Sequence, residues 1–174
     1  MEENQPKTGT FALTYGLLLG AASAIFTFML YTMDMHYQNE WPVIIISIAI
    51  SLTALIVGMI QFKKANNGFM SFGQALKVGV GVSLIGGVIA IIFSLILSNV
   101  IDPEMIDKAM EFQKSKLMES TALKVEQIEA QLEMQRKFTT PAMQILFGLL
   151  TSIVSGFIFS LIPALVLKKQ EVLD

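Results

Sequence analysis

The amino-acid sequence predicts an all-α integral membrane protein: a bundle of four transmembrane helices with an amphipathic, charged helical segment between spans three and four. The 174-residue chain is 53% hydrophobic and only 15% charged, whereas soluble domains average about 45–50% and about 25%. Four long stretches also contain no Asp, Glu, Lys, Arg or His, namely residues 11–33, 41–62, 78–100 and 138–167. Each is long enough to cross the hydrocarbon core as a helix, which takes about 20 residues.

We expect one membrane domain over residues 1–174, with spans at about 11–33, 41–62, 71–99 and 141–167. The first span follows a leader with two acids and one lysine, and its apolar run continues past a candidate cleavage site at Ala24. These features favour an uncleaved helix over a signal peptide. Before the third span, residues 69–76 read as a short interfacial helix capped by Ser71, with interfacial anchors at Trp41, Phe72 and Lys77.

Small residues recur at four-residue spacing in three of the spans. In membrane helices this pattern allows two backbones to approach closely, so it predicts a tight bundle. The glycine-rich run from Gly79 to Gly87 belongs to this pattern, because a dinucleotide-binding loop would need a preceding strand and an exposed turn. The candidate helix-packing residues are Gly16, Gly20, Ala24, Gly79, Ser83, Gly87, Ser152, Gly156 and Ser160.

The segment at about 102–138 is too long and too regular to be an unstructured loop. It opens with Asp102-Pro103-Glu104, which is typical of a helix start with a capping acid, and has no glycine and no further proline up to Lys137. One continuous helix would be roughly 50 Å long, and a break near residues 119–121 would give a hairpin. Its methionine-rich apolar stripe could pack on the protein's own membrane surface, bind a partner or act as a mobile gate.

Lysines set the expected orientation. Residues 34–40 contain no Lys or Arg, residues 63–77 contain three lysines, and the C-terminal tail begins with two more. Short loops rich in Lys and Arg stay in the cytoplasm, so both termini should be cytoplasmic. The loop at 101–137 should then lie outside, although Arg136 and Lys137 next to the fourth span oppose this placement.

The chemistry-bearing residues give no support for catalysis. The chain has no cysteine and a net charge of −2, so disulfides, thiolate chemistry and nucleic-acid binding are not expected. The spans hold no ionisable group at membrane depth, which disfavours a proton relay. The only histidine is His36. A metal site from Asp34, His36 and Glu40 is conceivable, but we expect a solvated loop histidine, no metal, no cofactor and no enzyme.

The residues from Phe69 to Lys77, the glycine-rich continuation of that helix and the Asp102-Pro103-Glu104 exit together resemble the bacterial membrane-protein family known as domain of unknown function 4199. The likeness covers nearly the whole chain. It implies a multi-pass protein of the bacterial inner membrane, and it brings no ligand, activity or catalytic residue.

We therefore predict a non-catalytic membrane protein that acts through helix packing and protein contacts, in an accessory or assembly role. Its expected partners are the lipid bilayer and either further copies of the chain or another membrane protein. The alternative is a small transporter or channel subunit for a small solute, which would use the hydroxyls of spans two to four, such as Ser83 and Ser155.

Overall fold

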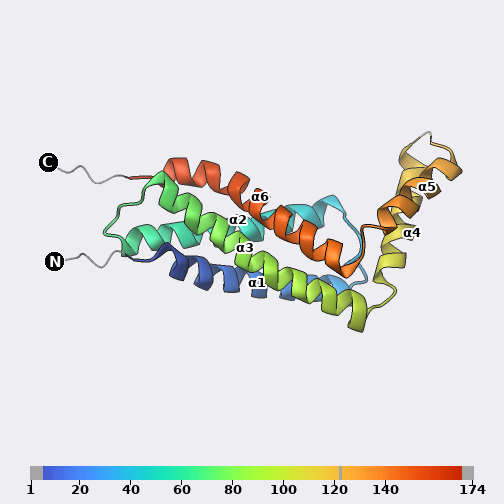
Figure 1. Cartoon of the computed structure of the whole chain (residues 1–174), viewed down its shortest axis with the longest axis horizontal. Helices are drawn as coiled ribbons and strands as arrows, with labels where there is room; N and C mark the ends of the chain where they lie inside the picture. The colour runs from blue at the N-terminus through green and yellow to red at the C-terminus, as the bar shows by residue number, and fades with distance from the viewer. Residues whose placement is uncertain (1–5, 122, 170–174) are drawn as a thin grey trace.

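The computed structural model of the chain describes residues 6–121 and 123–169. Its helices form an elongated bundle that ends in a helical hairpin (Figure 1). Four of the helices are long and apolar enough to span a membrane, so the predicted all-α membrane fold is confirmed. In chain order the elements are α1 (Thr8–Thr32), α2 (Trp41–Ala65), α3 (Phe72–Ile96), a π-helical turn η1 (Leu97–Ile101), α4 (Met105–Ser120), α5 (Val125–Arg136) and α6 (Pro141–Leu167).

Helix α3 is the centre of the bundle, because it packs along both α1 and α6. Glycines make the close approach possible. A Cβ placed on Gly16 of α1 would lie 2.6 Å from Cβ of Ile85 on α3, and one placed on Gly156 of α6 would lie 2.6 Å from Cβ of Ser83. Such distances are too short for two carbon atoms, so only glycine permits this helix separation.

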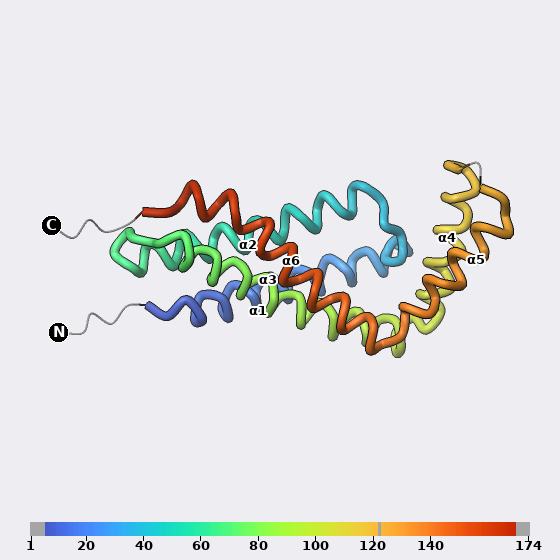
Figure 2. The backbone as a smooth tube through the Cα atoms, turned by 45° about the horizontal axis from the view of Figure 1, so that its top comes forward, coloured from blue at the N-terminus to red at the C-terminus, as the bar shows by residue number. Residues whose placement is uncertain are grey.

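The buried core occupies one half of the bundle. We call the end near the two chain termini the terminal end and the opposite end the hairpin end (Figure 1). The fully buried side chains of α2 and the first half of α3 lie toward the terminal end: Leu55, Met59, Phe62, Ala75, Val78 and Val82. By contrast, no residue is buried in the first half of α2, from 41 to 49. Toward the hairpin end α2 separates from the other spans (Figure 2).

The connection between α2 and α3 is a tight turn. Asn67 and Gly68 both have positive φ, at 53° and 85°. Ser71 then caps α3 in a capping box with Gln74, which satisfies backbone N–H groups at the helix start. The predicted short interfacial helix at residues 69–76 is wrong as a separate element, because α3 runs without interruption from Phe72.

The segment between the third and fourth spans is a helical hairpin. Helix α4 ends at Ser120 and α5 begins at Val125, so the chain breaks next to the expected point and folds back. Ile128 and Leu132 of α5 are buried, and Lys114 of α4 pairs with Glu129 of α5 at 2.6 Å. The hairpin lies beyond the end of the bundle and points away from its long axis (Figures 1 and 2). Part of the apolar stripe is buried within the hairpin, at Ile128 and Leu132, whereas Met118, Val125 and Met134 are exposed. The stripe does not pack along the spanning helices.

Candidate functional site

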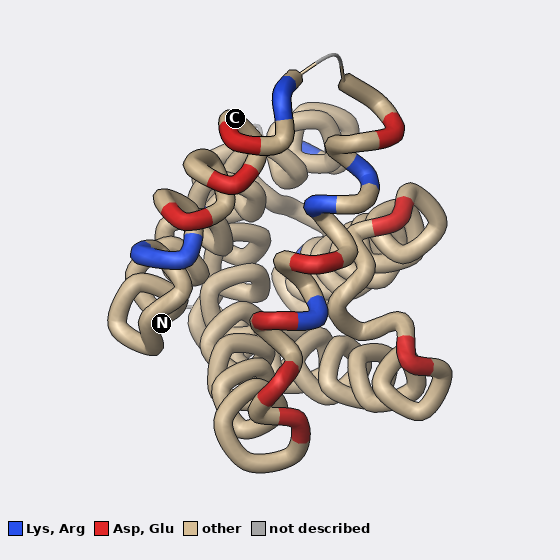
Figure 3. Tube along the Cα trace, turned by 90° about the vertical axis from the view of Figure 1, so that its right-hand side faces the viewer, with Lys and Arg blue, Asp and Glu red and all other residues tan. Residues whose placement is uncertain are grey.

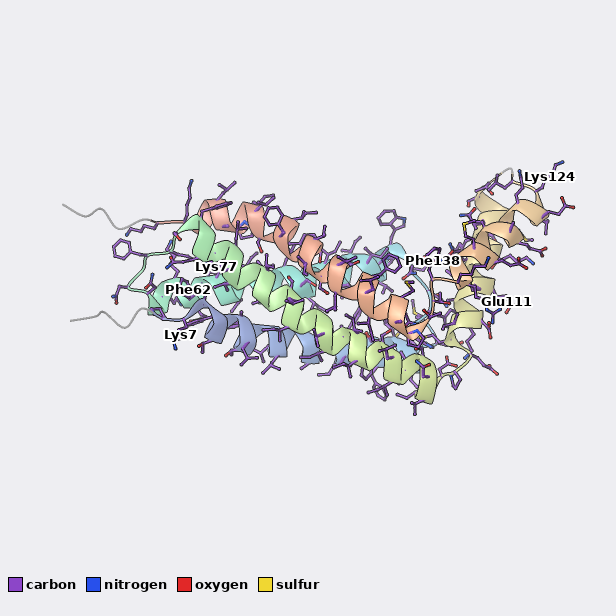
Figure 4. All side chains as sticks on the ribbon, viewed as in Figure 1. Lys7, Phe62, Lys77, Glu111, Lys124 and Phe138 are labelled. Atoms are coloured by element: carbon purple, nitrogen blue, oxygen red, sulfur yellow. The ribbon has the colours of Figure 1, made fainter. Side chains whose placement is uncertain are left out.

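The two ends of the bundle differ in charge. At the terminal end the described charged residues are all lysines: Lys7, Lys63, Lys64, Lys77, Lys168 and Lys169. All described acidic residues lie at the hairpin end, together with the remaining basic residues. The middle parts of the spans contain no Asp, Glu, Lys, Arg or His. Figure 3 faces the hairpin end and shows acidic and basic residues there, and Figure 4 shows the side chains along the whole bundle. Two candidate sites remain in this arrangement: a polar cluster where the hairpin joins the bundle, and a cavity inside the spans.

His36, Asp102 and Lys108 form the cluster at the base of the hairpin, which we call the clasp. His36 Nε2 lies 2.9 Å from Asp102 Oδ2, and Lys108 Nζ donates to both oxygens of Asp102 at 3.0 and 2.9 Å. These residues come from the α1–α2 loop, from the residue that follows η1, and from α4. The clasp therefore joins three separate segments at a single carboxylate.

The π-helical turn places this carboxylate. Asp102 N–H donates to the carbonyl of Leu97 at 2.7 Å, which ends the third span and turns Asp102 inward. The side chain of Asp102 is 8% exposed and that of His36 only 1% exposed. The expectation that Asp102 caps the following helix is wrong, because α4 has no side-chain cap and its first residue is Met105. A buried carboxylate needs partners, and here they come from other segments.

The ion pair shifts the pKa values of both of its members. The hydrogen bond from Lys108 is the main cause that lowers the pKa of Asp102; burial opposes it and the hydrogen bond with His36 adds to it. In return, the hydrogen bond to Asp102 raises the pKa of Lys108. Asp102 is therefore a carboxylate at neutral pH, and the clasp contains a permanent ion pair.

Aromatic rings enclose the histidine. The rings of Tyr31 and Tyr37 contact His36 edge-on, with centroids 5.1 and 5.2 Å away, and Phe112 of α4 follows at 6.3 Å from Tyr37. The expectation of a solvated histidine is wrong, because the ring is buried and its Nδ1 atom has no hydrogen-bond partner among the described residues. Tyr31, His36, Tyr37 and Phe112 thus form a continuous row of ring contacts from α1 to the hairpin.

The other members of the conceivable metal site have different partners. Glu40 pairs with Lys116 of α4 at 3.0 Å, and Asp34 accepts a bond of 3.4 Å from Tyr37. The hydrogen bond to Glu40 raises the pKa of Lys116. Within the described residues no group of three or more His, Cys, Asp or Glu side chains is arranged to hold a metal ion.

A groove of about 390 Å³ lies beside the clasp, between the α1–α2 loop and the hairpin. Its lining combines apolar and polar residues and includes two methionines, Met105 and Met110. Tyr37, Ile106, Phe112 and Lys116 also line it.

The predicted packing residues lie on the faces where α3 meets α1 and α6. Opposite α6, added Cβ atoms on Gly79 and Gly87 would lie 2.9 Å and 2.7 Å from the Cβ atoms of Ser160 and Ser152. On α1, Gly20 faces Ile89, and Ala24 is half-buried. Of the predicted anchors, Trp41 and Lys77 are exposed, whereas Phe72 packs against the core.

A second cavity of about 130 Å³ lies among all four spans, with five serines in its lining. Each serine is within about three residues of the middle of its own helix, so the cavity lies halfway along the spans. Ser51, Ser152 and Ser155 donate to carbonyls of their own helices. The other two serines in the lining are Ser23 of α1 and Ser83 of α3.

The clasp was not predicted from the sequence. The signal was nevertheless present, because the predicted topology places the α1–α2 loop and the 102–138 segment on the same side of the membrane, where His36 and Asp102 can meet. Within its own loop each residue has an ordinary explanation, as a lone histidine or a helix-start acid, so the local sequence gives no sign that the two pair.

The fold and its four long, apolar helices define the class of the protein: an all-α, multi-pass membrane protein. More narrowly, the model of a family described as "Protein of unknown function (DUF4199)" matches residues 14–169, so the chain belongs to this family. The resemblance noted from Phe69–Lys77 and Asp102–Glu104 is thereby confirmed. Searches among curated proteins and among solved structures find no match to the chain.

Proposed function

We propose that this protein is a non-catalytic membrane protein that displays the α4–α5 hairpin on one side of the membrane and binds a protein partner there, in an accessory or assembly role. The observation that carries this proposal is the groove beside the clasp, whose lining includes Met105, Met110, Tyr37 and Phe112. Methionine and aromatic side chains are enriched at contact surfaces, since they adapt to a partner's shape and bury a large area.

The clasp supports the proposal because it fixes the hairpin. The described part of the hairpin meets the spans only around η1 and the α1–α2 loop. Without the buried Asp102 contacts, the ion pair that remains among the described residues between the α1–α2 loop and α4 is Glu40–Lys116, whose side chains are 36% and 54% exposed; exposed pairs of this kind contribute little. A surface whose position is set in advance loses less entropy when it binds.

We further propose that the membrane is the bacterial inner membrane, with both termini in the cytoplasm and the hairpin outside. The charged residues that the structure describes at the terminal end are all lysines, and this supports the orientation. A reporter that is active only in the cytoplasm, fused after Asp174, should be active, and the same reporter inserted in the α4–α5 connection should be inactive. The reverse pattern would refute the orientation without touching the proposed binding role.

Photo-crosslinking tests the partner-binding proposal. A photoreactive residue at Met110, in the groove, should give one discrete crosslinked product in membranes, and a product of twice the monomer mass would identify a second copy as the partner. The same residue at Glu119, near the hairpin tip and outside the groove, should give none. Absence of a Met110 product, or equal products at both positions, would contradict the proposal.

A second candidate function is a small transporter or channel subunit for a small solute. The serine-lined cavity between the spans favours it. This candidate predicts solute flux in reconstituted vesicles that depends on Ser83 or Ser155, and unchanged flux in both alanine variants would remove its basis.

A further inference from the structure

The cavity among the spans combines features that a purely structural packing defect would not share. Its lining contains one serine or more from each spanning helix: Ser23 from α1, Ser51 from α2, Ser83 from α3, and Ser152 and Ser155 from α6. No ionisable side chain contributes to it. A dry cavity in a membrane bundle would be expected to have an apolar lining.

The side chain of Ser83 indicates that the cavity can hold a bound molecule. The residue is only 8% exposed, and it contacts the backbone of α6 so closely that a Cβ on Gly156 would lie 2.8 Å from its hydroxyl oxygen. Ser83 lines the cavity, and its hydroxyl makes no hydrogen bond to another described residue, unlike those of Ser152 and Ser160, which bond back to their own helix. The hydroxyl oxygen is not among the fully buried atoms without a partner, so a small molecule can reach it and supply the hydrogen bond that it lacks.

The position of the cavity also gives it a route of access. Toward the terminal end, the bundle is sealed by fully buried side chains such as Met59, Val78 and Val82. Toward the hairpin end, the first half of α2 has no buried residue. The cavity lies where these two halves meet, so we expect access from the hairpin side.

We infer that this cavity is a binding site for small, uncharged molecules that both donate and accept hydrogen bonds. A volume of about 130 Å³ has room for about four waters at roughly 30 Å³ each, or for one small polyol. Hydroxyl linings suit such guests because each hydroxyl can donate one bond and accept two. An ion is not the expected guest, since the lining offers no charge. The inference does not depend on the partner-binding role, and it requires occupancy, not transport.

The absence of native cysteine allows a direct test. Single-cysteine variants of the full chain, in lipid vesicles, are treated with methyl methanethiosulfonate, and the mass of the intact protein reports modification. A thiol reacts as its thiolate, which forms only where water reaches it. Ser83→Cys should therefore be modified. If that variant does not fold, Ser23→Cys at the same cavity replaces it.

Three further single-cysteine variants serve as matched controls. Val154→Cys lies at the same depth on α6 but faces outward, with the native side chain 54% exposed, and Ser160→Cys lies in the dry packed face, where the native residue is 0% exposed. Both should stay unmodified, while Ser120→Cys on the exposed hairpin gives the rate for open solvent. If neither Ser83→Cys nor Ser23→Cys is modified, or if Val154→Cys is modified to the same extent, the inference is overturned.

Glycerol then identifies the guest. If glycerol slows modification of Ser83→Cys but leaves Ser120→Cys unchanged, a polyol takes the site. If modification of Ser83→Cys proceeds at the same rate with and without glycerol, the occupant is water. Either result supports an occupied polar site. Modification of Ser83→Cys without solute flux in the same vesicles would separate this inference from the transporter candidate.

Discussion

Asp102→Ala is the most informative perturbation of the clasp. The substitution removes the carboxylate that accepts from Lys108 and bonds to His36. The two partners respond differently, because Lys108 has a side chain 38% exposed and can turn to water, whereas His36 is 1% exposed and cannot. The cost therefore comes mainly from the histidine, which would keep two buried ring nitrogens without a partner.

The magnitude follows from that burial. A buried polar group that loses its hydrogen-bond partner costs about 1–3 kcal/mol. Since about 1.4 kcal/mol changes an equilibrium tenfold, local opening should become about 5- to 150-fold more populated. Amide hydrogen exchange measures this directly. Protection should fall in the α1–α2 loop and the first turns of α4, and should not change in α3, where the packing is intact.

Two further variants decide whether the reasoning is right. Asp107→Asn removes an ion pair with Arg136 whose side chains are 61% and 64% exposed, and exposed pairs contribute little, so exchange should hardly change. Combining Asp102→Ala with His36→Phe replaces both members of the buried pair by apolar groups, which should restore part of the protection. Unchanged protection in Asp102→Ala, or a double variant no better than the single one, would refute the account.

The remaining predictions concern packing and pH. Gly87→Ala should destabilise the fold by about 1–3 kcal/mol through overpacking, because the new methyl group meets Ser152 Cβ at 2.7 Å, and a lower Tm in detergent would report this loss. Adding Ser152→Gly should recover the Tm, and Gly73→Ala, with nothing within 4 Å of the added Cβ, should not lower it. Because the hydrogen bond from Lys108 lowers the pKa of Asp102, the stability from this carboxylate is complete above its ordinary pKa near 4 and is lost as the pH falls through the lowered folded value. The exchange difference between wild type and Asp102→Asn should therefore stay constant from about pH 7 to about pH 5, and a difference that disappears in that range would contradict the assignment.

Much of the membrane architecture could be predicted from the sequence, because the bilayer imposes strong and simple constraints. A spanning helix must be long, apolar and free of charge, and residues 41–62 and 141–167 satisfy this without tertiary information. Small residues at four-residue spacing also indicate which helix faces can approach closely. The faces that carry Gly79 and Gly87 do meet α6 in the structure.

Long-range pairings could not be predicted in the same way. His36 and Asp102 are 66 residues apart, and their pairing depends on the rotation of α3 and on the π-helical turn that ends it. Nothing in the local pattern at 97–101 specifies a π-helical turn. The divergence of α2 is similarly hidden, because an isoleucine-rich stretch such as 44–46 reads the same whether it faces lipid or a neighbouring helix.

The contrast between α2 and the other spans explains how one bundle contains both a sealed half and a polar cavity. Helices α3 and α6 meet at Gly79–Ser160 and Gly87–Ser152, eight residues apart on each helix, so their contact is continuous and antiparallel. Helix α2 has a single glycine, Gly58, where an added Cβ would lie 3.2 Å from the ring of Tyr15. Close approach at a glycine is thus confined to the second half of α2, because the first half contains no glycine. The serine-lined cavity begins where this close approach ends, which follows from the distribution of small residues along the four spans.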